Sequence, residues 1–123
     1  MNSRESVAKM KEAVAARFPE EAKATDAHME FYDADAYETW LERFCDTTNA
    51  AMAERDEQRV DAHLSFMSLH LEQGDADVRR AIDVAYTENL MWNLDVRAKR
   101  WAWPRIPANL KQLYVQMWGE PKL

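Results

Sequence analysis

The sequence is poor in residues that form turns and cross-links: its 123 residues include only two glycines, four prolines and one cysteine. A lone Cys45 excludes an internal disulfide and a cysteine-rich zinc site. We therefore expect a reducing, cytoplasmic compartment. Because Gly74 and Gly119 are so far apart, no glycine-rich loop can cradle a phosphate. The scarcity of turn glycine also disfavours a β-sandwich or an α/β sheet.

Long apolar runs are missing too. No stretch approaches the ~20 consecutive apolar residues that a membrane span needs, and residues 1–11 alternate charged with small side chains. We therefore expect no membrane association. GxSxG, P-loop, GxGxxG and HExxH motifs are likewise missing. The expectation is a protein with no cofactor and no catalytic residues, and hence not an enzyme.

What the sequence does contain is a wealth of helix formers, chiefly Ala, Glu, Arg, Lys, Leu and Met. With 47% hydrophobic residues the chain can build its own core. We predict an all-α fold, a single compact domain spanning 1–123 with five to six helices. Apolar residues recur every three or four positions in most of these helices. The predicted helices cover about 3–18, 20–32, 35–52, 57–73, 76–93 and 107–118.

Local signals define several of these boundaries. Asp35 followed by Glu38 has the spacing of a capping box at the start of the third helix. Gly74 suits the end of the fourth helix and Asp75 the N-cap of the fifth. So short a connection predicts an antiparallel αα-hairpin. The segment 94–106 is expected to be irregular, or a short helix broken at Pro104.

The hairpin sequence Gln-Gly-Asp-Ala-Asp-Val-Arg-Arg-Ala-Ile at 73–82 resembles a HEAT-type helical hairpin. Together with Tyr-Thr-Glu-Asn-Leu at 86–90 and Pro-Ala-Asn-Leu-Lys-Gln-Leu-Tyr at 107–114, it resembles an uncharacterised family of small all-helical bacterial proteins. The resemblance implies a HEAT-like arrangement or an irregular bundle. It also implies a binding function, of the kind that toxin-immunity and other antagonist proteins have, without catalytic residues.

Charge is unevenly distributed along the chain. Residues 1–61 carry 15 acidic and 8 basic side chains, whereas residues 62–123 carry 7 and 8. Glu38, Glu42 and Asp46 are four residues apart and therefore share one helical face, with Asp35 just before them. This face is either an ordinary solvated surface or a negative surface that attracts a basic partner.

A second patch interleaves basic and aromatic residues: Arg97, Lys99, Arg100, Trp101, Trp103 and Arg105. Such a pattern can hold single-stranded nucleic acid, but a chain of pI about 5.1 lacks the basic character that binding requires. We expect the tryptophans to pack under a loop and the charges to pair with acids elsewhere. Trp101 and Trp103 remain the tryptophans predicted to be exposed for partner binding.

Two further features bear on chemistry. His63 and His70 are seven residues apart on one helix and could ligate a metal only with a carboxylate from elsewhere. Cys45 lies on an apolar stripe beside Phe44 and Asp46, which predicts a buried structural thiol. Neither feature completes a recognisable catalytic or metal site.

These observations favour a protein-binding module. The leading hypothesis is an immunity or antagonist protein that neutralises a basic toxin or effector by one-to-one binding through Asp35, Glu38, Glu42 and Asp46, with Trp101 and Trp103. One alternative is an acidic mimic of nucleic acid that inhibits a DNA-binding protein. Another is a metal-dependent helical enzyme that uses carboxylates with His63 and His70. The partner and the oligomeric state stay open.

Overall fold

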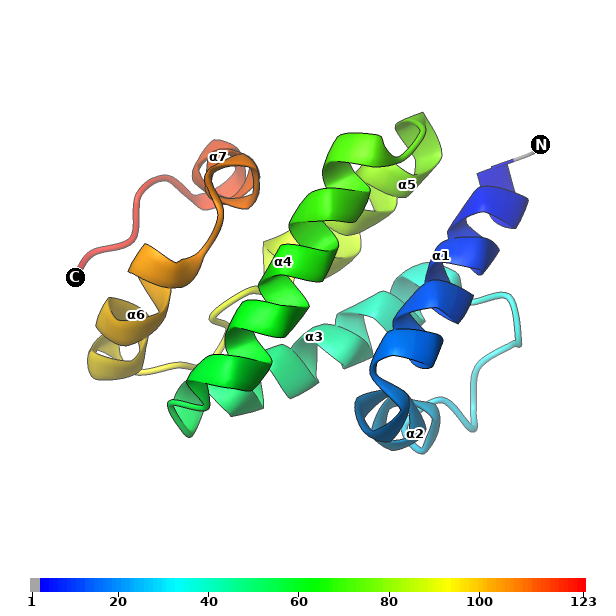
Figure 1. Ribbon diagram of the computed structural model, residues 1–123, viewed down its shortest axis with the longest axis horizontal. Coiled ribbons are helices and arrows are strands. Elements are labelled where there is room, and N and C mark those ends of the chain that lie inside the picture. Colours follow the sequence, from blue (N-terminus) through cyan, green and yellow to red (C-terminus); the bar gives the residue numbers. More distant parts are fainter. Residues whose placement is uncertain (1–2) are drawn as a thin grey trace.

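The computed structural model describes residues 3–123, and this part of the chain is helical without strands, as predicted (Figure 1). Its seven α-helices are α1 (Ser3–Arg17), α2 (Pro19–Asp26), α3 (Tyr37–Ala53), α4 (Glu57–Gln73), α5 (Ala76–Ala81), α6 (Val96–Ala102) and α7 (Ala108–Trp118). Three short segments join them: a π-helix η1 (Ile82–Tyr86) and the 3₁₀ turns η2 (Thr87–Asn89) and η3 (Trp103–Arg105). Within the described residues, no helix is long and apolar enough to cross a membrane.

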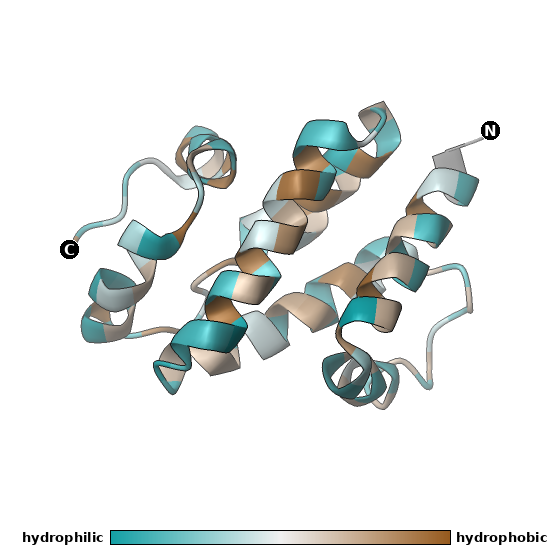
Figure 2. Ribbon diagram, in the orientation of Figure 1, coloured by the Kyte–Doolittle hydropathy of each residue, from teal (hydrophilic) through white to brown (hydrophobic). Residues whose placement is uncertain are grey.

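Helix α3 organises the core. It contacts α1, α2, α4, α6 and the π-helix η1, and it lies behind α4 in Figure 1, between the α1–α2 end and the α6–α7 end. Apolar positions alternate with polar ones along α4 as bands of brown and teal (Figure 2). Burial of the apolar bands holds the helices together. The largest fully buried side chains include Trp40, Leu41, Phe44, Met52, Leu64, Met67, Ile82 and Tyr86.

The start of α3 differs from the prediction. The helix begins at Tyr37 with Ala36 as its N-cap, one residue after the Asp35 N-cap that the sequence predicted. The cause is a turn immediately before the helix, in which the Ala36 N–H donates to the Asp33 carbonyl at 3.1 Å. This turn shifts the first helical residue two positions past Asp35.

The α4–α5 hairpin forms as predicted. The Asp75 carboxylate accepts a hydrogen bond from the Val78 N–H at 2.9 Å, which caps α5. Gly74, however, has φ −75°, so it is not the left-handed C′ residue that we expected. Space explains the glycine instead: a Cβ there would lie 2.6 Å from both the His70 carbonyl oxygen and a Val78 methyl carbon.

The predicted long helix over 76–93 is wrong. The α-helix ends at Ala81, and the chain continues through η1 and η2 into a turn in which Met91 and Asn93 have φ 64°. Buried Asn49 fixes this turn, because its side chain donates to the Asn89 carbonyl and accepts from the Met91 N–H, both at 2.8 Å. A long-range polar contact therefore overrides the local helical pattern.

Helix α2 is shorter than predicted, because it ends at Asp26 and residues 27–36 form successive turns. In this segment Ala22 and Thr25 are buried, whereas Ala24 and Phe31 are exposed. The C-terminal region agrees better with the sequence. The short helix α6 gives way to η3, which contains Pro104, and α7 follows.

Candidate protein-binding surface

The predicted acidic residues gather on the outer side of α3. Asp35 and Asp46 are exposed, and Glu38 and Glu42 are half-buried. Burial raises the pKa of Glu42 above its usual 4.5; nearby Arg43 opposes this, while Glu88 and Asp46 add to it. Glu88 comes from η2, so the fold adds a further carboxylate that the sequence pattern did not reveal. We call Glu38, Glu42, Asp46 and Glu88 the acidic surface.

Arg43 lies next to one of these carboxylates. The Arg43 guanidinium is 3.3 Å from the Asp46 carboxylate, and both side chains are exposed to solvent. A surface ion pair of this kind contributes about 0–1 kcal/mol. This pair therefore holds Arg43 and Asp46 together only weakly.

The acidic surface borders a groove next to exposed aromatic side chains. The groove has a volume of about 610 Å³ and is formed by α2, the 27–36 loop and α3. Asp46 belongs to both the groove and the acidic surface. The lining residues are Ala24, His28, Phe31, Tyr32, Arg43, Asp46, Thr47 and Ala50.

Trp101 and Trp103 are less accessible than predicted. Both are half-buried against the core, and their ring faces are covered by cations of the same chain: Arg105 at 4.3 Å from Trp101 and Lys111 at 5.1 Å from Trp103. Arg105 also pairs with Glu57 at 3.1 Å. This matches the expectation that the patch packs internally, and the partner-binding role of the two tryptophans stays a prediction.

The exposed tryptophans are instead Trp92 (60% exposed) and Trp118 (53% exposed). They line a pocket of about 320 Å³ together with Lys99. The Trp118 indole N–H donates to the Glu88 carbonyl at 2.9 Å, so this pocket adjoins the acidic surface. The exposure of Trp92 could not be predicted from the sequence, because Trp92 continues the apolar stripe of the predicted helix over 76–93.

A buried polar chain runs through the core from Glu21. Its carboxylate lies 2.7 Å from His63 Nε2, His63 Nδ1 lies 2.9 Å from the Thr48 hydroxyl, and that hydroxyl lies 2.9 Å from Tyr86 OH. A carboxylate only accepts, so Nε2 donates to Glu21. In a neutral ring Nδ1 then accepts from Thr48, and Thr48 in turn accepts from Tyr86. All four groups are thereby satisfied.

The order carboxylate, imidazole, hydroxyl is that of a catalytic triad. Thr48, however, has no exposed surface and sits under Tyr86, so no substrate can reach its oxygen. The hydrogen-bonded side chains of Glu21, His63, Thr48 and Tyr86 therefore form a structural network. Sequence reasoning missed it because its members come from α2, α3, α4 and η1 and share no motif.

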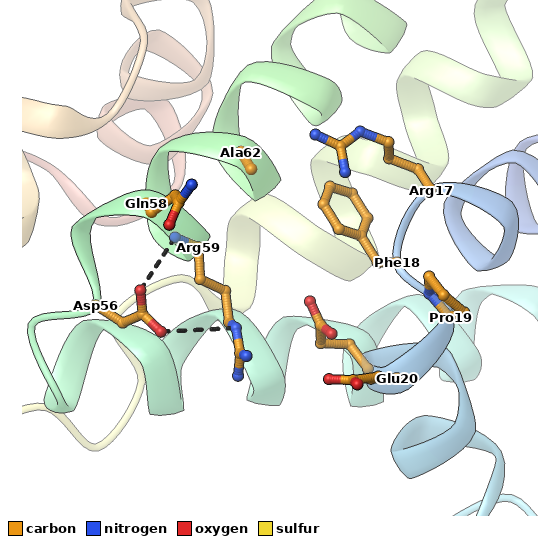
Figure 3. A pocket seen from close by; sticks show the side chains of 9 residues that line it. Arg17, Phe18, Pro19, Glu20, Asp56, Gln58, Arg59 and Ala62 are labelled. Carbon is orange, nitrogen blue, oxygen red and sulfur yellow. Dashed lines mark hydrogen bonds and ion pairs between the residues drawn. The ribbon is translucent and has the colours of Figure 1, made fainter.

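Figure 3 shows the pocket where this chain approaches the surface, a space of about 400 Å³ between the α1–α2 junction and the first turn of α4. Arg17 and Phe18 enter from one side, and Asp56 and Arg59 from the other. The Arg59 side chain is 3.7 Å from the Asp56 carboxylate, and Arg17 stacks on Phe18 at 4.9 Å. Both arginines of this pocket therefore contact neighbouring side chains of the same pocket.

The histidines do not form the alternative metal centre. Both nitrogens of His63 are hydrogen-bonded, and His70 lies two helical turns away, about 10 Å along α4, stacked on Phe66 at 4.2 Å between ring centroids. No group of three or more metal-ligating side chains occurs among the described residues. The metal-enzyme alternative therefore loses its predicted ligand pair.

Cys45 is buried, as expected. Its thiol donates to the Tyr86 carbonyl at 3.2 Å, next to the π-helix. Burial, with the nearby Asp46 and Glu42 carboxylates, holds the pKa of the thiol well above 9.0. A thiol in this environment is an inert structural group.

The structure thus defines a small all-helical domain whose most distinctive outer feature is an acidic surface flanked by exposed aromatics. The chain belongs to a family known as a domain of unknown function, DUF7674, whose model matches residues 11–119. No curated protein and no solved structure matches the chain.

Proposed function

We propose that this protein is a protein-binding module whose acidic surface engages a basic partner, and more specifically that it is an antagonist that neutralises a toxin or effector. The observation that carries the proposal is the gathering of like charges by the fold. Burial is the largest cause of the raised pKa of Glu42, and Glu88 and Asp46, which reach it from different segments, both add to it. A surface that keeps such repulsion sacrifices some stability, and proteins accept this most often at functional sites.

Exposed aromatic rings border the same surface. Phe31 and Tyr32 line the groove that contains Asp46, and Trp118 is bonded to the backbone of Glu88. Large rings next to charge are typical of binding hot spots in protein interfaces. They favour a protein partner over the alternative of a nucleic-acid mimic, as does Arg43, which interrupts the row of carboxylates.

The first experiment is affinity capture from a lysate of the source cells after nuclease treatment, with mass spectrometry of retained proteins. A single stoichiometric, basic protein is expected. Kinetics with that protein then test the surface: in Glu38→Lys/Glu42→Lys/Asp46→Lys, association should slow at least about tenfold, and the wild-type rate should fall with salt.

A matched control carries the same change of net charge elsewhere. Glu12, Glu54 and Glu72 are exposed carboxylates outside the acidic surface, and their reversal to lysine should change association far less. Equal slowing in both triple variants would assign the effect to net charge alone and reject the acidic surface as the binding site. Displacement of the captured protein by duplex DNA would instead favour the mimic.

A further inference from the structure

Phe31 has the largest exposed fraction, 91%, among the large hydrophobic side chains that the structure describes. Its neighbour Tyr32 is 50% exposed. Burial of such a ring would stabilise the protein, and the free protein forgoes this stabilisation. Single exposed apolar residues are common. The exposure of Phe31 indicates a binding role only if the backbone that carries it is ordered.

That backbone is held in place. The Tyr32 N–H donates to the Met29 carbonyl at 2.9 Å, which closes a turn with Glu30 and Phe31 at its two central positions. Met29 packs against the hydrophobic core, whereas Phe31 is displayed on the outside of the turn. A ring presented by an ordered turn loses little conformational entropy on binding.

Both ends of the loop are fixed as well. At its start, the Trp40 indole N–H donates to the Asp26 carboxylate at 2.8 Å, and at its end the 33–36 turn leads directly into α3. In Figure 1 the connection between α2 and α3 extends outward beyond the helices. The loop thus combines a protruding shape with a fixed backbone.

The surroundings of the ring are negative. Glu30 and Asp33 are exposed carboxylates within two residues of Phe31, and Asp46 lines the same groove. Arg43, which also lines the groove, pairs with Asp46. The complementary surface is therefore an apolar pocket framed by lysine or arginine side chains.

We propose that Phe31 is the anchor of the interface: it inserts into an apolar pocket within a basic cleft of the partner protein, and the 27–36 loop acts as a rigid plug. This inference rests on the proposed function and adds the element that blocks the cleft. The acidic surface governs the rate of association, and Phe31 governs the lifetime of the complex.

Site-specific photo-crosslinking in the source cells tests the plug with the full chain. A benzophenone amino acid replaces Phe31 in one variant, Ala50 in the groove in a second, and Leu69 in a third as the control. Leu69 is 48% exposed and lies on α4, away from the loop. Position 31 should crosslink to apolar residues bordered by lysine or arginine in one partner protein. Position 50 should crosslink to the same protein, and position 69 should not crosslink to it.

The outcomes separate the two proposals. A partner captured from position 50 but not from position 31 overturns the plug and keeps the protein-binding function. No crosslink from either position rejects both. A crosslink from position 31 to nucleic acid, or to an acidic protein surface, also overturns the plug.

Kinetics with the crosslinked partner give a second, independent readout. Phe31→Ala should speed dissociation about 10- to 100-fold with little change in association, and Phe31→Leu should fall between it and wild type. Leu69→Ala should match wild type. Because Phe31 is exposed, the thermal midpoint of the Phe31→Ala protein should equal that of wild type. An unaltered dissociation rate in Phe31→Ala overturns the proposal.

Discussion

Glu21 holds His63 at 2.7 Å between carboxylate oxygen and Nε2, although the histidine side chain has no exposed surface and the glutamate side chain is 13% exposed. Two effects compete at this contact. Burial lowers the pKa of His63 below 6.5, and the hydrogen bond that Nε2 donates to Glu21 raises it, with burial the larger effect. Arg59 and Arg17 lower it further. His63 is thus neutral in the folded protein at neutral pH.

The first prediction concerns pH. Because the folded pKa of His63 lies below its unfolded value near 6.5, the unfolded chain binds more protons in this window. The free energy of unfolding should therefore fall as pH drops through and below 6.5. Urea unfolding at about pH 7.5 and about pH 5.5 measures the change.

His70 also has a lowered pKa through burial, so its contribution has to be removed. A His28→Gln/His70→Gln variant keeps His63 as the sole histidine. Its free energy of unfolding should still fall at low pH by most of the amount seen in wild type. An NMR titration of its single imidazole gives the pKa directly. A value at or above 6.5 would contradict the prediction.

The second prediction concerns the hydroxyl in the middle of the buried chain. Thr48→Val keeps the shape of the side chain but leaves His63 Nδ1 and Tyr86 OH without a shared partner. Each buried unsatisfied group costs about 1–3 kcal/mol, so the variant should lose roughly 2–4 kcal/mol in urea unfolding. Ser65→Ala, an exposed change on α4, is the control and should lose under about 0.5 kcal/mol. If Thr48→Val and Ser65→Ala lose the same free energy of unfolding, the buried hydrogen-bond network adds nothing to stability.

Much of the fold could be predicted because several helices are set by local signals. The bounds of α4 agree with the predicted 57–73, and Asp75 caps α5 as its position suggested. The failures occur where distant residues decide the backbone. Asn49 lies 40 residues from Asn89, and no local pattern reveals that its side chain fixes the turn after η2.

The candidate site was only partly predictable for the same reason. Charge is a property of the sequence, so the helical spacing of the carboxylates of α3 could be seen in advance, whereas Glu88 comes near Glu42 only through folding. Exposure depends on packing: Trp101 lies under Arg105, whereas Trp92 sits between two residues with φ 64° and remains exposed. Phe31 was assigned to a helix that ends five residues earlier.

The third prediction tests the close approach at the α4–α5 hairpin. Gly74→Ala places a Cβ 2.6 Å from the His70 carbonyl oxygen, and backbone cannot move away cheaply. We expect a loss of about 1–3 kcal/mol in the free energy of unfolding. Gly119→Ala is a useful contrast, because nothing lies within 4 Å and only its φ of 77° opposes a side chain. It should lose about 1 kcal/mol or less near the end of the chain. Tolerance of alanine at 74 would show that the hairpin can open without loss.

The fourth prediction separates stability from binding at Glu42. Its pKa is raised in the folded state, so the ionised side chain opposes folding above 4.5, and the opposition disappears as pH falls and the group is protonated. Glu42→Gln should therefore stabilise the protein at neutral pH by a few tenths of a kcal/mol, the size of a relieved like-charge pair. The difference from wild type should vanish in acid. Glu12→Gln, an exposed change on α1, should alter stability less.

The same Glu42→Gln protein should associate more slowly with the partner, because one carboxylate of the acidic surface is gone. Glu42→Gln would then raise stability and slow binding, which is the behaviour expected of a residue that destabilises the fold but serves function. A variant that is stabilised yet binds at the wild-type rate would make Glu42 a merely unfavourable charge and leave Asp46 and its neighbours to carry the interface. A variant that is destabilised at neutral pH would show that Glu88 and Asp46 do not repel Glu42 as the geometry requires.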